Sequence, residues 1–180
     1  MGLLEFATWL QATPVSLAIQ STAWTVPALQ SLHILMIGVV FIAVLMIALR
    51  VLGLSRVDEP FASVWTRFAP FMWGGVAVMA ATGVLLTLSE PVRELMSLSF
   101  RLKMLLLAVG LASAAAFGRT MARVARAPGG ADGDGFPAGT RVAAVATVLL
   151  WLAVIFLGRA IAYDDAIWGG WSPAVAQGTP

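Results

Sequence analysis

Residues 24–49 have the sequence WTVPALQSLHILMIGVVFIAVLMIAL, and this stretch decides the fold. Between residues 27 and 49 the strongly polar side chains are those of Gln30, Ser31 and His33. As an α-helix with a rise of ~1.5 Å per residue, residues 27–49 would reach about 34 Å, which exceeds the ~30 Å hydrocarbon core of a bilayer. The stretch therefore predicts a membrane-spanning helix.

The composition of the 180 residues supports a membrane protein whose main partner is the lipid bilayer. Hydrophobic residues make up 60% of the chain, charged residues 11%, and the mean hydropathy is +0.92. The absence of cysteine excludes disulfides, thiolate metal sites, iron–sulfur clusters and covalently attached c-type haem. The net charge of +2 is too small to indicate nucleic acid, and the arginines cluster beside apolar segments.

Four apolar segments predict four spanning helices, over residues 25–50, 62–88, 100–118 and 138–162. A loop rich in Gly, Pro and Asp at 127–139 separates the last two, and we expect it to be mobile. Between the second and third spans we expect a short interfacial helix with Ser89 as its N-cap. Apolar residues recur at helical spacing over residues 2–12, which predicts an amphipathic helix lying in the interface. The expected fold class is an all-α polytopic bundle forming a single membrane domain over residues 1–180.

The distribution of basic residues predicts the topology. Four spans place both termini on one side, and basic residues favour the cytoplasmic side. The turns after the first and third spans are rich in arginine, whereas most cations of the other side lie within or near the spans. We therefore expect both termini to be periplasmic, in the inner membrane of a bacterium. The first group comprises Arg50, Arg56, Arg67, Arg119, Arg123, Arg126 and Arg141, and the second comprises Arg93, Arg101, Lys103 and Arg159.

His33 is the single histidine and lies about two turns inside the first span, where an ionisable group is expensive and indicates function. The predicted topology brings Lys103, the single lysine, and Arg159 to the same outer layer of the bundle. Met79 and Thr82 of the second span lie at a similar depth. Helix bundles commonly build cofactor sites from side chains of facing helices, so these residues are candidates for one site.

The predicted spans contain no aspartate or glutamate, so their cations need a rim acid or an anionic ligand. Haem b, with two propionates, meets this need. We expect His33 as the axial ligand, with Lys103, Arg159 and Arg101 facing the propionates. With one histidine the iron would be five-coordinate, would take Met79, Met104 or Lys103 as sixth ligand, or would take a ligand from a partner chain. The candidate rim acids are Glu90, Glu94, Asp164 and Asp165.

Other interpretations of the same residues stay open. His33 could bond a neighbouring helix within a polar patch that includes Gln30, or it could handle protons. Lys103 could extend to the membrane surface, and Arg159 could anchor its helix at the interface. Methionines such as Met79 are more often core residues than ligands.

Several segments resemble an uncharacterised family of bacterial four-helix inner-membrane proteins, over nearly the whole chain. The segments are FATWLQATPVSLAIQSTAWTVPALQSLHILMIGVV, FAPFMWGGVAVMAATGVLLTLSEP, FRLKMLLL and LGRAIAY. That family carries an acidic residue where this chain has Gln30, which weakens a proton-relay role for this position. Its other characteristic positions match Trp24, Pro27, His33, Lys103, Gly158 and Arg159.

More distantly, a histidine on the first helix and a lysine on the third resemble HemJ-type protoporphyrinogen oxidases and the CopD-like membrane proteins. This resemblance implies haem b within the bundle and either electron transfer or oxidation of a tetrapyrrole.

The sequence supports three functional hypotheses. The first is a b-type haem protein that transfers electrons between the quinone pool and a periplasmic redox partner. The second is a non-catalytic anchor or accessory subunit of a larger membrane complex. The third is a porphyrinogen oxidase, an oxidoreductase in which Lys103 is the candidate catalytic residue, contacting a substrate carboxylate or moving protons. A homodimer is compatible with the small-residue faces of the second and third spans.

Overall fold

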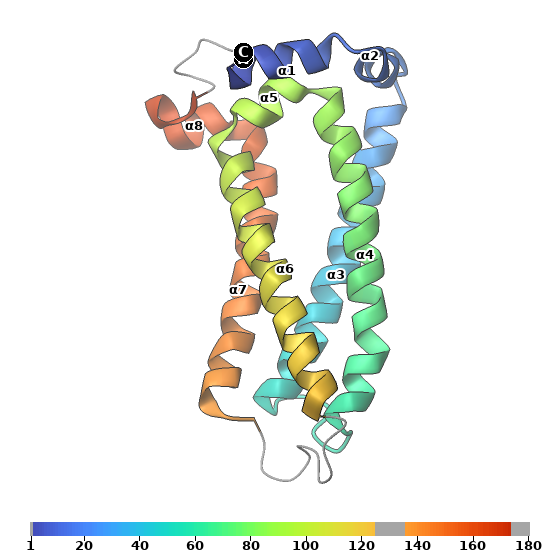
Figure 1. The fold of residues 1–180 in the computed structure, drawn as a ribbon, viewed down its shortest axis with the longest axis vertical. Coiled ribbons are helices and arrows are strands. Elements are labelled where there is room, and N and C mark those ends of the chain that lie inside the picture. Colours follow the sequence, from blue (N-terminus) through green and yellow to red (C-terminus); the bar gives the residue numbers. More distant parts are fainter. Residues whose placement is uncertain (1, 125–135, 174–180) are drawn as a thin grey trace.

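The computed structural model describes residues 2–124 and 136–173, and every regular element in these residues is helical. The long helices α3, α4, α6 and α7 run up and down the bundle in alternating directions (Figure 1). Within the described part of the chain, four helical segments are long and apolar enough to cross a membrane. The predicted all-α bundle with four spans is therefore confirmed. The long helices are α3 (Thr25–Leu52), α4 (Phe61–Ser89), α6 (Leu98–Val124) and α7 (Ala138–Ala160).

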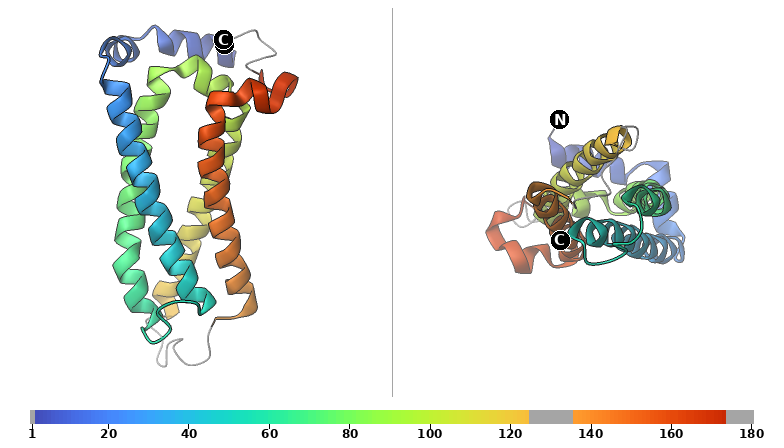
Figure 2. Two further views of the ribbon diagram at one scale, coloured as in Figure 1. Left: turned by 180° about the vertical axis from the view of Figure 1, so that it is seen from behind. Right: turned by 90° about the horizontal axis from the view of Figure 1, so that it is seen from below.

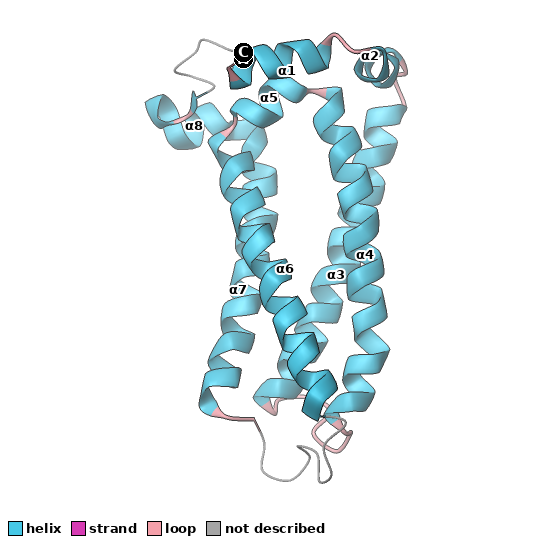
Figure 3. Cartoon of the chain, in the orientation of Figure 1, coloured by secondary structure: helices cyan, strands magenta, loops and turns pink. Residues whose placement is uncertain are grey.

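Short helices gather at one end of the bundle, which we call the cap end (Figures 1 and 3). We call the other end, where residues 53–60 join α3 to α4, the turn end. The N-terminal helix expected over residues 2–12 is α1, which lies across the bundle and packs on α5. The loop predicted for 127–139 lies, up to residue 135, outside the described residues. The short elements at the cap end are α1 (Leu3–Gln11), α2 (Pro14–Ser21), α5 (Pro91–Met96), η1 (Ile161–Tyr163), α8 (Asp164–Trp168) and η2 (Gly169–Trp171).

Many large apolar side chains on the long helices are exposed on the outside of the bundle. Ile34, Phe71, Leu105 and Phe156 are each at least 60% exposed. Such a surface suits hydrocarbon rather than water, because soluble proteins rarely expose contiguous apolar surface of this extent. The exposed surface and the helix lengths together indicate a multi-pass membrane protein.

Two close contacts between helices depend on glycine. A Cβ atom at Gly75 of α4 would lie 2.6 Å from Cγ2 of Val40 on α3. A Cβ atom at Gly110 of α6 would lie 2.8 Å from Cδ2 of Leu150 on α7. The small residues of the second and third spans therefore allow close helix packing inside this chain, as their spacing predicts.

The tightly packed core lies toward the turn end. One buried cluster joins α3, α4 and α7 through Val40, Ala43, Val44, Met72 and Trp151. Closer to the turn end, α4 and α6 meet where Trp65 packs on Phe117 and Gly118. In α3, the described residues before Val40 are all half-buried or exposed.

Toward the cap end the bundle therefore opens into two helix pairs, α3 with α4 and α6 with α7 (Figures 1 and 2). His33 lies in this less tightly packed half.

The prediction that Ser89 caps the short interfacial helix was wrong. Ser89 is the last residue of α4, and its hydroxyl donates to the Leu86 carbonyl oxygen at 2.6 Å. The hydroxyl thus closes the helix that contains it, which is a common alternative for serine. Glu90 takes the N-cap position of α5 without a side-chain cap, and Pro91 is the first helical residue.

Candidate functional site

His33 faces α4 and forms a hydrogen bond with a buried threonine. Its Nδ1 lies 2.7 Å from Oγ1 of Thr82. The next residue of α4 is Gly83, where an added Cβ would lie 3.5 Å from Cε1 of His33. The threonine therefore fixes one edge of the imidazole, and the glycine leaves room beside the ring.

The surroundings of Thr82 favour one tautomer of His33. Oγ1 of Thr82 is 2.9 Å from the Val78 carbonyl oxygen and 3.2 Å from that of Met79. When the hydroxyl proton is donated to one of these carbonyl oxygens, Oγ1 accepts from Nδ1–H of His33. In the neutral imidazole the lone pair is then on Nε2. Histidines that bind metals are commonly held this way, with one ring N–H donated to a fixed acceptor.

Lys103 extends along α7 in the same half of the bundle. A Cβ atom at Gly158 would lie 3.7 Å from the Lys103 Nζ and 3.8 Å from its Cε, so the glycine makes room for the side chain. The ammonium is half-buried and lies within electrostatic range of both His33 and Glu94. In the described residues no carboxylate oxygen lies within 4 Å of Nζ. This cation is therefore available to an anionic ligand.

Among the rim acids, Glu94 of α5 is the one whose charge interacts with the Lys103 ammonium. Burial raises the pKa of the Glu94 carboxyl, while Lys103 and Arg93 oppose the rise. Glu90, another acid considered from the sequence, pairs with Arg93 at 2.6 Å. Glu94 thus closes the cap end of the site with a carboxyl that ionises less readily than usual.

The structure places Arg101 and Arg159 on the surface of the cap end. Nε of Arg101 donates to the Leu95 carbonyl oxygen at 3.1 Å. The Arg159 guanidinium lies 5.5 Å from the ring centre of Tyr163, and its Nη2 is 3.4 Å from the phenolic oxygen. Both side chains are exposed, an arrangement typical of interfacial anchors.

Met79 is half-buried and packs against the core cluster of α3, α4 and α7. Of the candidate residues, the structure therefore brings together His33, Thr82 and Lys103, with Met79 one turn from Thr82.

Sequence reasoning missed a buried carboxylate at the cap end. Asp164 is 6% exposed, and its Oδ1 accepts from the Ser97 hydroxyl at 2.8 Å and the Ser99 N–H at 2.9 Å. Its Oδ2 accepts from the Leu98 N–H at 3.2 Å and from the Ser172 hydroxyl. Burial raises the pKa of Asp164, but hydrogen bonds from Ser172, Ser99 and Ser97 outweigh it and hold the pKa below its usual value.

Asp164 therefore caps the N-terminus of α6 from a distant part of the chain and positions the helix that carries Lys103. The motif Ser97-Leu98-Ser99 before an apolar helix is a recognisable N-cap signal, but the sequence does not identify the acid that joins it.

Comparisons with family models, with curated proteins and with solved structures gave no match for this chain. The resemblances stated from the sequence therefore stay predictions. In the described residues no group of three or more His, Cys, Asp or Glu is placed to hold a metal ion. A metal held by a macrocycle needs fewer protein ligands than one held by side chains alone, so one histidine is enough for an axial ligand.

Proposed function

We propose that the protein binds a b-type haem in the cap half of the bundle and transfers electrons between the quinone pool and a partner at the cap end. The observation that supports this most is the His33–Thr82 hydrogen bond. It directs Nδ1 to Thr82 and leaves Nε2 as the ring nitrogen for an axial bond. By the distribution of arginines, the cap end would be periplasmic.

The residues around His33 fit a haem in three respects. Nε2 of His33 is available for an axial bond. The half-buried Lys103 has no carboxylate within 4 Å in the described residues and would stabilise a propionate. The α3 residues before Val40 are all half-buried or exposed, so the cap half is less tightly packed than the turn half. When bound, the haem would supply one-electron redox chemistry.

The roles of the chain's own residues follow from their positions. Thr82 orients the His33 ring through its hydrogen bond to Nδ1. Lys103 attracts a carboxylate to the same layer, and Gly158 leaves room for its side chain.

Absorption spectra of the detergent-purified protein test this proposal. The wild type, His33→Ala and the control Ser31→Ala are expressed with ample haem and recorded oxidised and dithionite-reduced. Ser31 suits the control because it is exposed and donates to its own helix, to the Pro27 carbonyl oxygen at 2.8 Å. We expect a Soret band with reduced α and β bands in the wild type and Ser31→Ala, and their loss in His33→Ala at equal protein yield. A colourless, well-folded wild type would overturn the proposal and favour the anchor subunit.

The placement of Lys103 also favours a second candidate, oxidation of a porphyrinogen. A half-buried ammonium near His33 would contact a carboxylate of a tetrapyrrole substrate as well as a haem propionate. An oxidase would consume porphyrinogen with oxygen or quinone as the oxidant, and Lys103→Met would raise its KM. An electron carrier would show a reversible redox spectrum without consuming porphyrinogen.

A further inference from the structure

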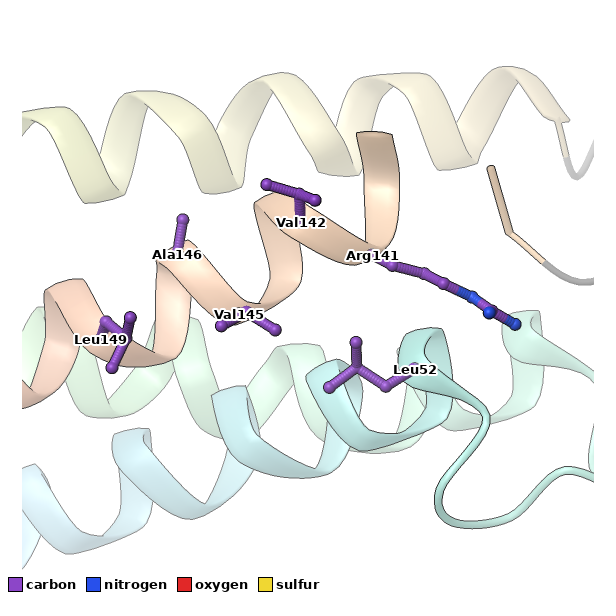
Figure 4. A pocket seen from close by; sticks show the side chains of 6 residues that line it. All are labelled: Leu52, Arg141, Val142, Val145, Ala146 and Leu149. Atoms are coloured by element: carbon purple, nitrogen blue, oxygen red, sulfur yellow. The ribbon is translucent and has the colours of Figure 1, made fainter. Parts of the chain in front are cut away.

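A shallow groove of about 400 Å³ lies at the turn end, between Leu52 of α3 and one face of α7 (Figure 4). Its lining is apolar apart from Arg141, whose side chain extends toward the turn after α3. The lining residues are Leu52, Arg141, Val142, Val145, Ala146 and Leu149.

Arg141 extends from α7 toward the turn that follows α3 (Figure 4). Its Nη2 lies 3.9 Å from the position that a Cβ atom would take at Gly53. Gly53 is the C-cap of α3 and has a φ of 73°, a conformation that favours glycine. The turn itself therefore explains why a glycine lies next to the Arg141 guanidinium.

This turn carries two acids, Asp58, which is exposed, and Glu59, which has partners of its own. Glu59 accepts from Arg56 Nη1 at 2.7 Å and pairs with Arg67 Nη2 at 3.2 Å. Its carbonyl oxygen also accepts from Nε of Arg50 at 2.9 Å. In the described residues no carboxylate lies within 4 Å of the Arg141 guanidinium. The groove therefore ends in a cation that no acid of the described chain neutralises.

The depth of the groove matches one leaflet of a bilayer. Arg141 is close to the start of α7, which begins at Ala138, and the end of a spanning helix would place its side chain at headgroup level. Residues 142–149 advance roughly 10 Å along the helix, within the ~15 Å of hydrocarbon that one leaflet provides. Arg141 would thus lie beside the headgroup of a phospholipid, and the apolar residues 142–149 would lie beside its acyl chain.

We propose that this groove binds one anionic phospholipid from the leaflet at the turn end. Arg141 would bind the phosphate, and one acyl chain would lie along Val142, Val145 and Leu149. Anionic rather than zwitterionic lipid is favoured because Arg141 has no carboxylate within 4 Å among residues 2–124 and 136–173, and because it lies at the arginine-rich end of the bundle. The proposal does not depend on haem binding.

Native mass spectrometry of delipidated protein in detergent tests this site. The probes are dioleoyl phosphatidylglycerol, dioleoyl phosphatidylcholine and inorganic phosphate. We expect the wild type to retain one phosphatidylglycerol in preference to phosphatidylcholine, and free phosphate to show no binding. Arg141→Gln should weaken phosphatidylglycerol binding by roughly five- to tenfold. Ala146→Trp should weaken both lipids by filling the groove.

Arg119→Gln is the matched control, because Arg119 is an exposed arginine at the turn end of α6 outside the groove. It should bind phosphatidylglycerol as the wild type does. Equal losses of phosphatidylglycerol binding in Arg119→Gln and Arg141→Gln would show that the basic end of the bundle attracts anionic lipid without a specific site, and would overturn the proposal. Equal affinity for the two lipids, phosphate binding alone, or unchanged binding in Ala146→Trp would each also overturn it. Circular dichroism establishes that the variants are folded.

Discussion

Replacing Asp164 by asparagine should destabilise the cap end strongly. The carboxylate accepts four hydrogen bonds, two on each oxygen, from Ser97, Leu98, Ser99 and Ser172. An asparagine keeps one acceptor oxygen and presents an N–H₂ group to the other two donors. A hydrogen bond to a charged group contributes about 1.5–3 kcal/mol, so losing two costs at most ~6 kcal/mol. Relaxation of the segment around the exposed Trp171 would recover part of this, and we expect a loss of about 3 kcal/mol.

Thermal unfolding in detergent, followed by circular dichroism, measures this loss. The control is Asp165→Asn, which removes the same charge one residue away at an exposed position. We expect Asp164→Asn to lower Tm by roughly 5–10 °C and Asp165→Asn to leave it nearly unchanged.

The pH dependence follows from the lowered pKa of Asp164. The contribution of Asp164 to the free energy of unfolding should be complete above about pH 5. It should fall as the pH drops below ~3.9, the pKa of an aspartate in the unfolded chain, and through the lower pKa of Asp164 in the folded protein. Equal Tm values for the two variants at pH 7 would refute the role assigned to Asp164.

The remaining predictions concern three other positions. Thr82→Val should lower haem affinity by about 10- to 100-fold, whereas Thr82→Ser should keep it, as measured by haem titration of apoprotein. Gly75→Ala should destabilise the bundle by about 1–3 kcal/mol in thermal unfolding, because its Cβ would lie 2.6 Å from Val40 Cγ2. Gly74→Ala, whose Cβ would meet nothing within 4 Å, should cost no stability. Because burial raises the pKa of Glu94, its ionisation lowers stability as pH rises above ~4.3, so Glu94→Gln should raise Tm at pH 7 but not at pH 4. An equal change at both pH values would contradict this assignment.

The sequence predicted those features that depend on local pattern. The length and composition of each apolar segment are enough to place the four spans. The spacing of Gly75 and Gly83 predicted a contact face on the second span, and the structure places both glycines against α3. Helical periodicity fixes which residues share a face, so these features needed no knowledge of the tertiary structure.

Features that depend on contacts between residues far apart in the sequence could not be predicted from local patterns. Asp164 and Ser97 are separated by 67 residues, and no local pattern indicates that a carboxylate after the last span caps the third. The sequence placed His33 and Thr82 in one layer but did not identify their hydrogen bond. It also expected Arg101 and Arg159 to face the propionates, and the structure shows both side chains exposed at the cap end, with contacts to Leu95 and Tyr163. Depth in the bilayer limits which residues can meet, and rotation about the helix axis decides which do.

The central claim is that His33 is the axial ligand of a haem, and imidazole rescue of His33→Gly tests it most directly. Reduced-minus-oxidised spectra of the purified variant are recorded with and without added imidazole, beside the wild type. We predict α and β bands in the wild type, none in His33→Gly alone, and their return when imidazole occupies the space left by the side chain. A wild type without these bands, or a His33→Gly variant that shows them without imidazole, would contradict the claim.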